Sequence, residues 1–106
     1  MGFAEQVALA KDTAFRDRVR MAAITAAVNV AGEAQSTLSS AAYHKRQVLA
    51  TRVLTNAGSG AQGDVLDMFA WAVAQNAAIT GASTDSDIQF TVNAIWSDCA
   101  GVHALD

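Results

Sequence analysis

Cys99, His103 and His44 are the side chains in this sequence that could support metal binding or nucleophilic catalysis. Cys99 and His103 are close enough in the sequence to lie near each other as metal ligands. A closed zinc site needs more Cys and His ligands than the chain has, since it contains one Cys and two His. A pair of Cys99 with His103 or His44 for covalent catalysis is a second interpretation. Cys99 falls on an apolar helical stripe, however, so a buried, unreactive thiol explains it better.

Asp85 and Asp87 resemble the beginning of a calcium-binding loop. Phe90 and Thr91 follow them, and the glycine and the bidentate Glu that such a loop requires are missing. A role in helix capping is therefore the better interpretation. The glycine-containing stretch "NAGSGAQGD" lacks the Lys and Ser or Thr of a phosphate-binding loop. We therefore expect no bound metal, no cofactor and no enzymatic activity.

Charge is distributed unevenly along the chain, although the net charge is only −3, which argues against strong nucleic-acid binding. The first 52 residues carry all seven Lys and Arg residues and four carboxylates, which gives +3. Residues 53–106 carry six carboxylates and no Lys or Arg, which gives −6. Such asymmetry indicates either association between subunits or packing of basic against acidic helices within one subunit. For association, the candidate subunit contacts are Arg16, Arg20, Lys45, Arg46, Asp64 and Asp67.

The composition predicts an all-α protein with one domain over residues 1–106. Ala supplies 24 of the 106 residues, and Pro, the strongest helix breaker, is absent. We expect a small bundle of about five helices, with a long central Ala-rich helix and a short C-terminal tail at 101–106. The longest apolar run, at 21–32, is too short to span a bilayer. The lone Cys and the absence of a basic signal-peptide region favour an intracellular protein without membrane contact.

Capping residues and apolar spacing place the first two helices. We expect a short helix at about 3–10, then Asp12 as the N-cap of a helix over about 13–33. The long helix has two apolar stripes, which predicts neighbours on more than one side. One stripe consists of Phe15, Val19, Ala22, Ala26 and Val30, and the other of Met21, Ile24 and Val28.

The remaining three helices are separated by polar, glycine-containing turns. The third is expected over about 40–55, ended by a left-handed cap at Asn56 and Gly58. The fourth is expected over about 64–76. Either Thr84 with Asp87 or Ser86 with Gln89 forms a capping box that begins the fifth, which runs to Gly101.

The fifth helix has large apolar residues on more than one side. Ile88, Val92, Ile95 and Cys99 follow helical spacing and are expected to face the core of the domain. Phe90 falls on the opposite side of the helix and Trp96 at the edge of the stripe. We expect both rings to face a partner, because aromatic residues are enriched at the centres of interfaces.

Three segments, "DTAFRDRVRMAAITAAVNVAGE", "YHKRQVLATRVL" and "SDIQFTVNAIWSDCAGV", together resemble small all-helical structural proteins of tailed bacteriophages. The most similar class is the head–tail connector, or adaptor, family. The resemblance rests on helix pattern and covers most of the chain. It implies a homo-oligomeric ring beneath the portal that continues the DNA channel from the capsid to the tail. Head-completion and tail-joining proteins of similar size share these features.

The resemblance also implies a location and partners. The protein would assemble in the host cytoplasm and lie in the neck of the virion. It would contact portal and tail proteins, while DNA passes through without sequence-specific binding. The alternative is a soluble helical protein–protein binding module or a small dimeric regulator. The candidate partner-binding residues, which include the C-terminal segment that reaches a neighbouring ring in that family, are Phe90, Trp96, Val102, His103, Leu105 and Asp106.

Overall fold

The protein is a small all-α bundle, as the sequence predicts. The computed structural model describes residues 2–32, 40–59 and 64–98, and this part of the chain contains five helices and no strand. None of the described helices is both long enough and apolar enough to cross a membrane. The helices are α1 (Phe3–Lys11), α2 (Thr13–Ala31), α3 (Ser40–Ser59), α4 (Asp64–Ala74) and α5 (Asp85–Asp98).

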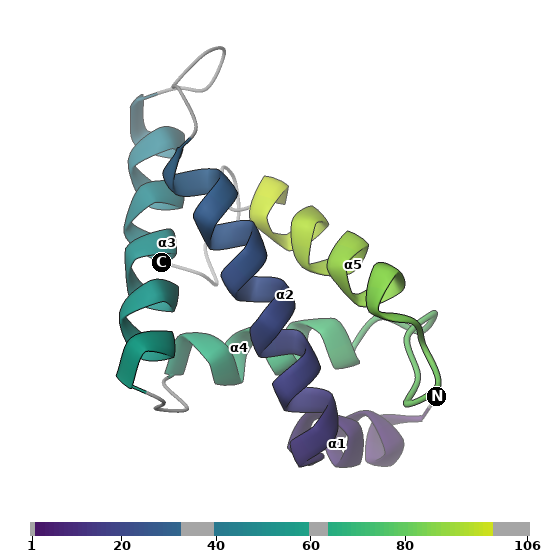
Figure 1. The fold of residues 1–106 in the computed structure, drawn as a ribbon. Coiled ribbons are helices and arrows are strands. Elements are labelled where there is room, and N and C mark those ends of the chain that lie inside the picture. The colour runs from purple at the N-terminus through teal and green to yellow at the C-terminus, as the bar shows by residue number, and fades with distance from the viewer. Residues whose placement is uncertain (1, 33–39, 60–63, 99–106) are drawn as a thin grey trace.

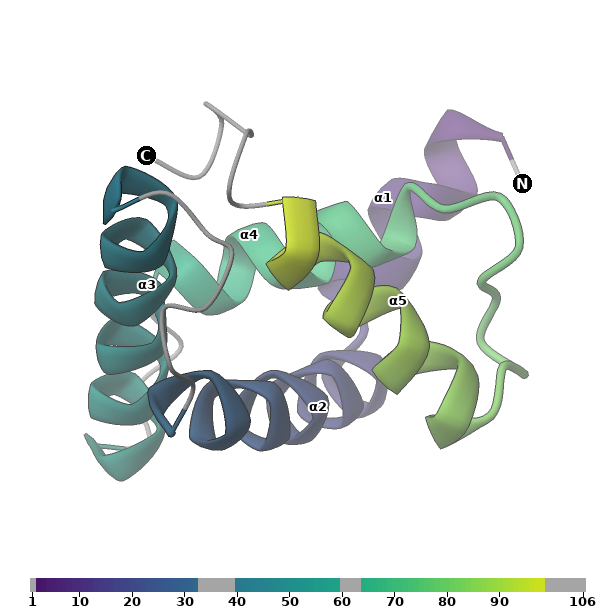
Figure 2. The ribbon, with the colours of Figure 1, turned by 90° about the horizontal axis from the view of Figure 1, so that it is seen from above.

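Helix α2 organises the bundle because it packs against all four of the other helices. Helices α3 and α5 lie on opposite sides of α2, while α4 crosses behind it and α1 packs along α4 (Figure 1). Seen from above, α2 and α4 form two layers that α3 joins at one end (Figure 2). The expectation of a long, Ala-rich central helix is therefore confirmed.

Short-range caps separate the helices where the sequence predicts them. Asp12 has extended backbone angles, and its Oδ2 accepts a hydrogen bond of 2.9 Å from the backbone N–H of Phe15, so it ends α1 and begins α2. At α5, the Asp87 N–H donates to the Thr84 hydroxyl at 3.1 Å, and the Thr84 N–H donates to the Asp87 carboxylate at 3.2 Å. The capping box of Thr84 with Asp87 is thereby confirmed.

The C-terminal ends of α2 and α4 each receive a hydrogen bond from a side chain of another helix. The last carbonyls of a helix have no intrahelical donor, and α2 to α5 have no basic residue in the last turn. Gln47 Nε2 on α3 donates to the Val30 carbonyl of α2 at 2.7 Å. Gln6 Nε2 on α1 donates to the Gln75 carbonyl just beyond α4 at 3.0 Å. These contacts link helix ends to neighbouring helices and add to the backbone hydrogen bonds of the terminal turns, such as that from the Gly32 N–H to the Val30 carbonyl.

The core lies where α2, α3, α4 and α5 meet. The rings of Phe69 on α4 and Trp96 on α5 lie 5.5 Å apart at a tilt of 37° in its interior. Ile79, in the connection between α4 and α5, is also buried and holds that segment against the bundle. The largest side chains that are almost fully buried are Trp96, Phe69, Ile88, Val19, Val53, Val73 and Val92.

Three helix ends differ from the sequence-based expectation. Helix α2 ends at Ala31, two residues before the expected end. Helix α3 continues through Asn56 and Gly58 to Ser59, so a left-handed cap after Thr55 is wrong. Helix α4 ends two residues early, at Ala74, because Asn76 forms a turn in which its Oδ1 accepts from the Ala78 N–H at 2.9 Å.

Candidate functional site

Phe90 is the most exposed large apolar side chain of the described residues. Its side lies opposite the buried stripe that Ile88 and Val92 form on α5, and the residue is 76% exposed. The expected outward direction of Phe90 is confirmed. A side chain of this size in water forfeits about 2 kcal/mol of burial free energy, so its position favours contact with another surface.

Trp96 does not share that outward direction. It is 2% exposed and packs on Phe69, so the expectation that it faces a partner is wrong. The reason is that α5 contacts both α2 and α4, and the buried arc is therefore wider than one stripe. Thr91 is buried on the other edge of the same arc.

Arg16, which was expected at a subunit contact, forms contacts within the subunit, and so does Arg18 on the same helix. Arg16 on α2 pairs with Asp67 on α4 and also donates to the Ala10 carbonyl at 3.1 Å. Arg18 Nε lies 2.8 Å from Asp85 Oδ1 at the beginning of α5. Packing of the basic half against the acidic half of the same chain thus accounts for part of the charge asymmetry.

Of the other two Arg residues expected at subunit contacts, Arg20 is partly exposed and Arg46 is buried. Arg20 Nε lies 3.9 Å from Asp17 Oδ1, three residues earlier on the same helix. Arg46 is 8% exposed and donates to the backbone carbonyl of Trp96, so it belongs to the interior and not to an exposed basic face. The side chain of Asp64 lies outside the part that the structure describes.

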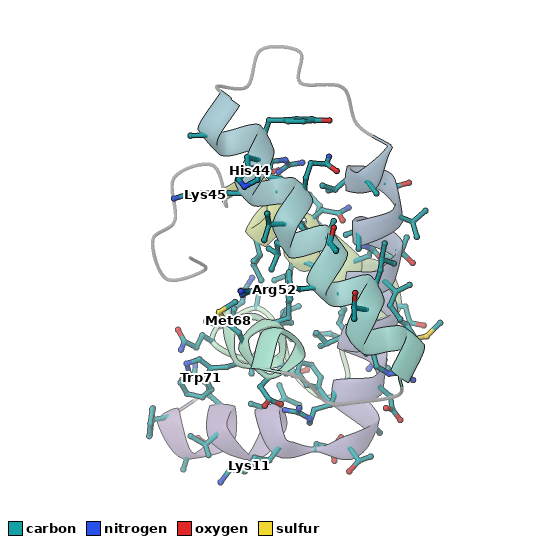
Figure 3. The ribbon with its side chains drawn as sticks, turned by 90° about the vertical axis from the view of Figure 1, so that its left-hand side faces the viewer. Lys11, His44, Lys45, Arg52, Met68 and Trp71 are labelled. Atoms are coloured by element: carbon teal, nitrogen blue, oxygen red, sulfur yellow. The ribbon has the colours of Figure 1, made fainter. Side chains whose placement is uncertain are left out.

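The outer side of α3 is basic with an apolar centre. His44, Val48 and Arg52 are spaced four residues apart and are exposed, Val48 by 40%. Lys45 lies beside them and is half-buried, and Figure 3 shows His44, Lys45 and Arg52 along one side of α3. The helix carries no carboxylate. We call His44, Lys45, Val48 and Arg52 the α3 face.

The outer side of α2 exposes two large apolar side chains, which the sequence pattern did not predict. Met21 and Val28 are each 58% exposed, although their stripe was expected to pack against a second layer. Ile24 of the same stripe is partly buried against the core. The four neighbours of α2 cover its other sides, and they leave Met21 and Val28 in solvent.

Two open hollows lie along the seam between α2 and α5. Gln89 Nε2 crosses this seam and donates to the Ala22 carbonyl at 3.0 Å. One hollow is lined by Arg18, Met21, Ala22, Thr25, Asp85 and Gln89, and the other by Ala26, Asn29, Val30, Arg46, Asn93, Trp96 and Ser97.

The chemistry-bearing residues singled out in the sequence do not form a centre among the described residues. No group of three or more His, Cys, Asp or Glu side chains within 2–32, 40–59 and 64–98 is arranged to hold a metal ion. His44 is exposed on α3, and Asp85 and Asp87 occupy the start of α5 in ion-pair and capping roles. The remaining candidates, Cys99, Val102, His103, Leu105 and Asp106, lie outside the described residues.

Comparison with known proteins identifies no relative: no family model matches the chain, and no curated protein or solved structure is significantly similar to it.

Proposed function

We propose that this chain is a structural, non-enzymatic protein that assembles through the outward faces of its helices, as a ring-forming subunit of the head–tail connector class that its sequence resembles. In this role it would form a ring under the portal, contact portal and tail proteins, and continue the DNA channel in the neck of a virion. The exposed position of Phe90, opposite the core stripe of α5, carries the proposal. Among the described residues the core is built without the Phe90 side chain, which leaves it available for contact with another molecule.

The proposal is tested by the assembly state of the purified chain. Sedimentation velocity at increasing concentration, followed by negative-stain electron microscopy, should show closed rings. A second sample should contain this chain together with the portal protein encoded by a neighbouring gene. This sample tests whether ring assembly requires the portal as a template. A monomer in both samples would refute the proposal.

A second candidate function is a small dimeric helical binding module or regulator. It is favoured by the exposed apolar side of α2, where Met21 and Val28 suit pairing of two α2 helices about a two-fold axis. The variant Met21→Lys separates the candidates, because it should abolish such a dimer and leave a ring that uses other helices intact.

A further inference from the structure

Helices α3 and α5 carry charged residues of opposite sign. Helix α3 carries Lys45, Arg46, Arg52 and His44 and no carboxylate, and of these Arg46 alone is turned inward. Helix α5 carries three carboxylates and no Lys, Arg or His. Each helix also exposes one large apolar residue, Val48 on α3 and Phe90 on α5.

The acidic residues nearest to Phe90 stand at the beginning of α5. Asp87 is exposed and lies one helical turn before Phe90. Asp85 lies about 140° around the helix from Phe90 and pairs with Arg18 of α2, so it is not on the same side. We call Asp87 and Phe90 the α5 face.

The two faces lie on different sides of the subunit. Helix α3 forms one edge of the molecule, and the N-terminal half of α5 lies across α2 from it in both views (Figures 1 and 2). The α3 face and the α5 face of one subunit therefore cannot meet each other. They are positioned to meet the opposite faces of two neighbouring copies.

We propose that the α5 face of one copy binds the α3 face of the next, with Phe90 packed on Val48 and the Asp87 carboxylate near the Arg52 guanidinium. This proposal rests on the proposed function and specifies its interface. Such a contact is heterologous, since two different surfaces meet, and its repetition gives a ring when the rotation closes. The occupant of each face is thus a second copy of this chain, selected by opposite charge around an apolar centre.

A mixing experiment tests the direction of this contact. The double variant Val48→Glu/Arg52→Glu disables the α3 face, and Phe90→Lys disables the α5 face. Both sets of residues are exposed, so the variants should fold, which thermal melting checks. Each variant alone should be monomeric, with association at least about tenfold weaker than that of the wild type. Mixed in equal amounts, the two should form a dimer of one copy of each and nothing larger, because each retains one intact face.

Met21→Lys serves as the matched control, because it adds a charge at an exposed apolar position outside both faces. It should assemble as the wild type does. Raising the salt concentration from 0.1 M to 1 M should weaken the wild-type assembly, as the screening length falls from about 10 Å to about 3 Å.

The outcomes separate this inference from the proposed function. A wild type that assembles while the mixed variants give no dimer would overturn the inference and leave ring assembly standing. Met21→Lys should not be the variant that loses assembly while the double α3 variant keeps it. That result would overturn the inference and indicate pairing through α2. Association that requires added duplex DNA would make nucleic acid the occupant of the α3 face and overturn it too. A wild-type monomer under every condition, portal included, would remove both proposals.

Discussion

The guanidinium of Arg46 on α3 donates a hydrogen bond to the backbone carbonyl of Trp96 in the last turn of α5. This contact joins two helices that scarcely touch elsewhere, since α2 and α4 supply most of the packing around them. It places a positive charge at the negative end of the α5 dipole and satisfies a carbonyl that lacks an intrahelical donor. A residue that looks like part of a basic surface in the sequence therefore stabilises the interior.

Replacing Arg46 should destabilise the folded subunit. Arg46→Met keeps much of the aliphatic stem but removes the donor to Trp96, which should lower the free energy of unfolding by about 2 kcal/mol. Arg52→Met is the matched control on the same helix, because Arg52 is exposed, and it should change stability by less than about 0.5 kcal/mol. Urea titration followed by circular dichroism measures both values. Equal effects of the two substitutions would contradict the structural role of Arg46.

The boundary between α1 and α2 should depend on the Asp12 carboxylate. Asp12→Ala removes the acceptor for the Phe15 N–H and should lower the free energy of unfolding by about 1 kcal/mol. Asp17→Ala is the comparison, because Asp17 is exposed on the same helix and its ion pair with Arg20 is long, so the change should stay below about 0.5 kcal/mol. Thermal melts of the two variants under identical conditions should rank them in that order, and a reversed order would contradict the capping role.

Phe90 and Val92 lie two residues apart on α5 and should respond in opposite ways to truncation. Val92 is fully buried, so Val92→Ala should lower the free energy of unfolding by about 2 kcal/mol through lost burial and a small cavity. Phe90→Ala should change it by less than about 1 kcal/mol and weaken assembly instead. Chemical denaturation at a concentration where the subunit is monomeric, paired with sedimentation, separates the two effects. If Phe90→Ala unfolds the isolated subunit, the Phe90 side chain belongs to the core.

Local signals predicted most of the helix starts in this fold. Asp12, and Thr84 with Asp87, act through hydrogen bonds that span only three residues, so the sequence alone contains both partners. The apolar spacing of Phe15, Val19 and the residues that continue their stripe likewise predicted the buried side of α2.

Non-local contacts account for the errors. Whether Trp96 is buried depends on α4 supplying Phe69 opposite it, and whether Arg46 turns inward depends on the end of α5 lying nearby. The second stripe of α2 shows the same limit, since apolar spacing marks Met21 and Val28 without indicating whether a neighbour covers them. For the candidate site, sequence spacing found Phe90, but the combination of Val48 with His44 and Arg52 required knowledge of which α3 residues face outward.

The two tryptophans should differ sharply as fluorescent probes, which tests the burial of Trp96 directly. Trp71 is half-buried, with its ring 6.0 Å from that of Phe3 in an edge-to-face arrangement, whereas Trp96 is almost fully buried. Trp71→Phe, which leaves Trp96 as the sole tryptophan, should therefore give blue-shifted emission that iodide barely quenches. Trp96→Phe should leave the red-shifted, quenchable emission of Trp71.

The same variants bear on the energetics of the core. The indole Nε1 of Trp96 is buried, and no described residue offers it a hydrogen-bond acceptor. Trp96→Phe removes this unpaired donor, whose burial costs about 1–3 kcal/mol, and so offsets part of the lost packing. We expect Trp96→Phe to lower the free energy of unfolding by less than about 2 kcal/mol, and Trp96→Ala by about 4 kcal/mol. Strong iodide quenching of Trp96 in the Trp71→Phe variant would instead place this ring at the surface, where the sequence pattern alone had put it.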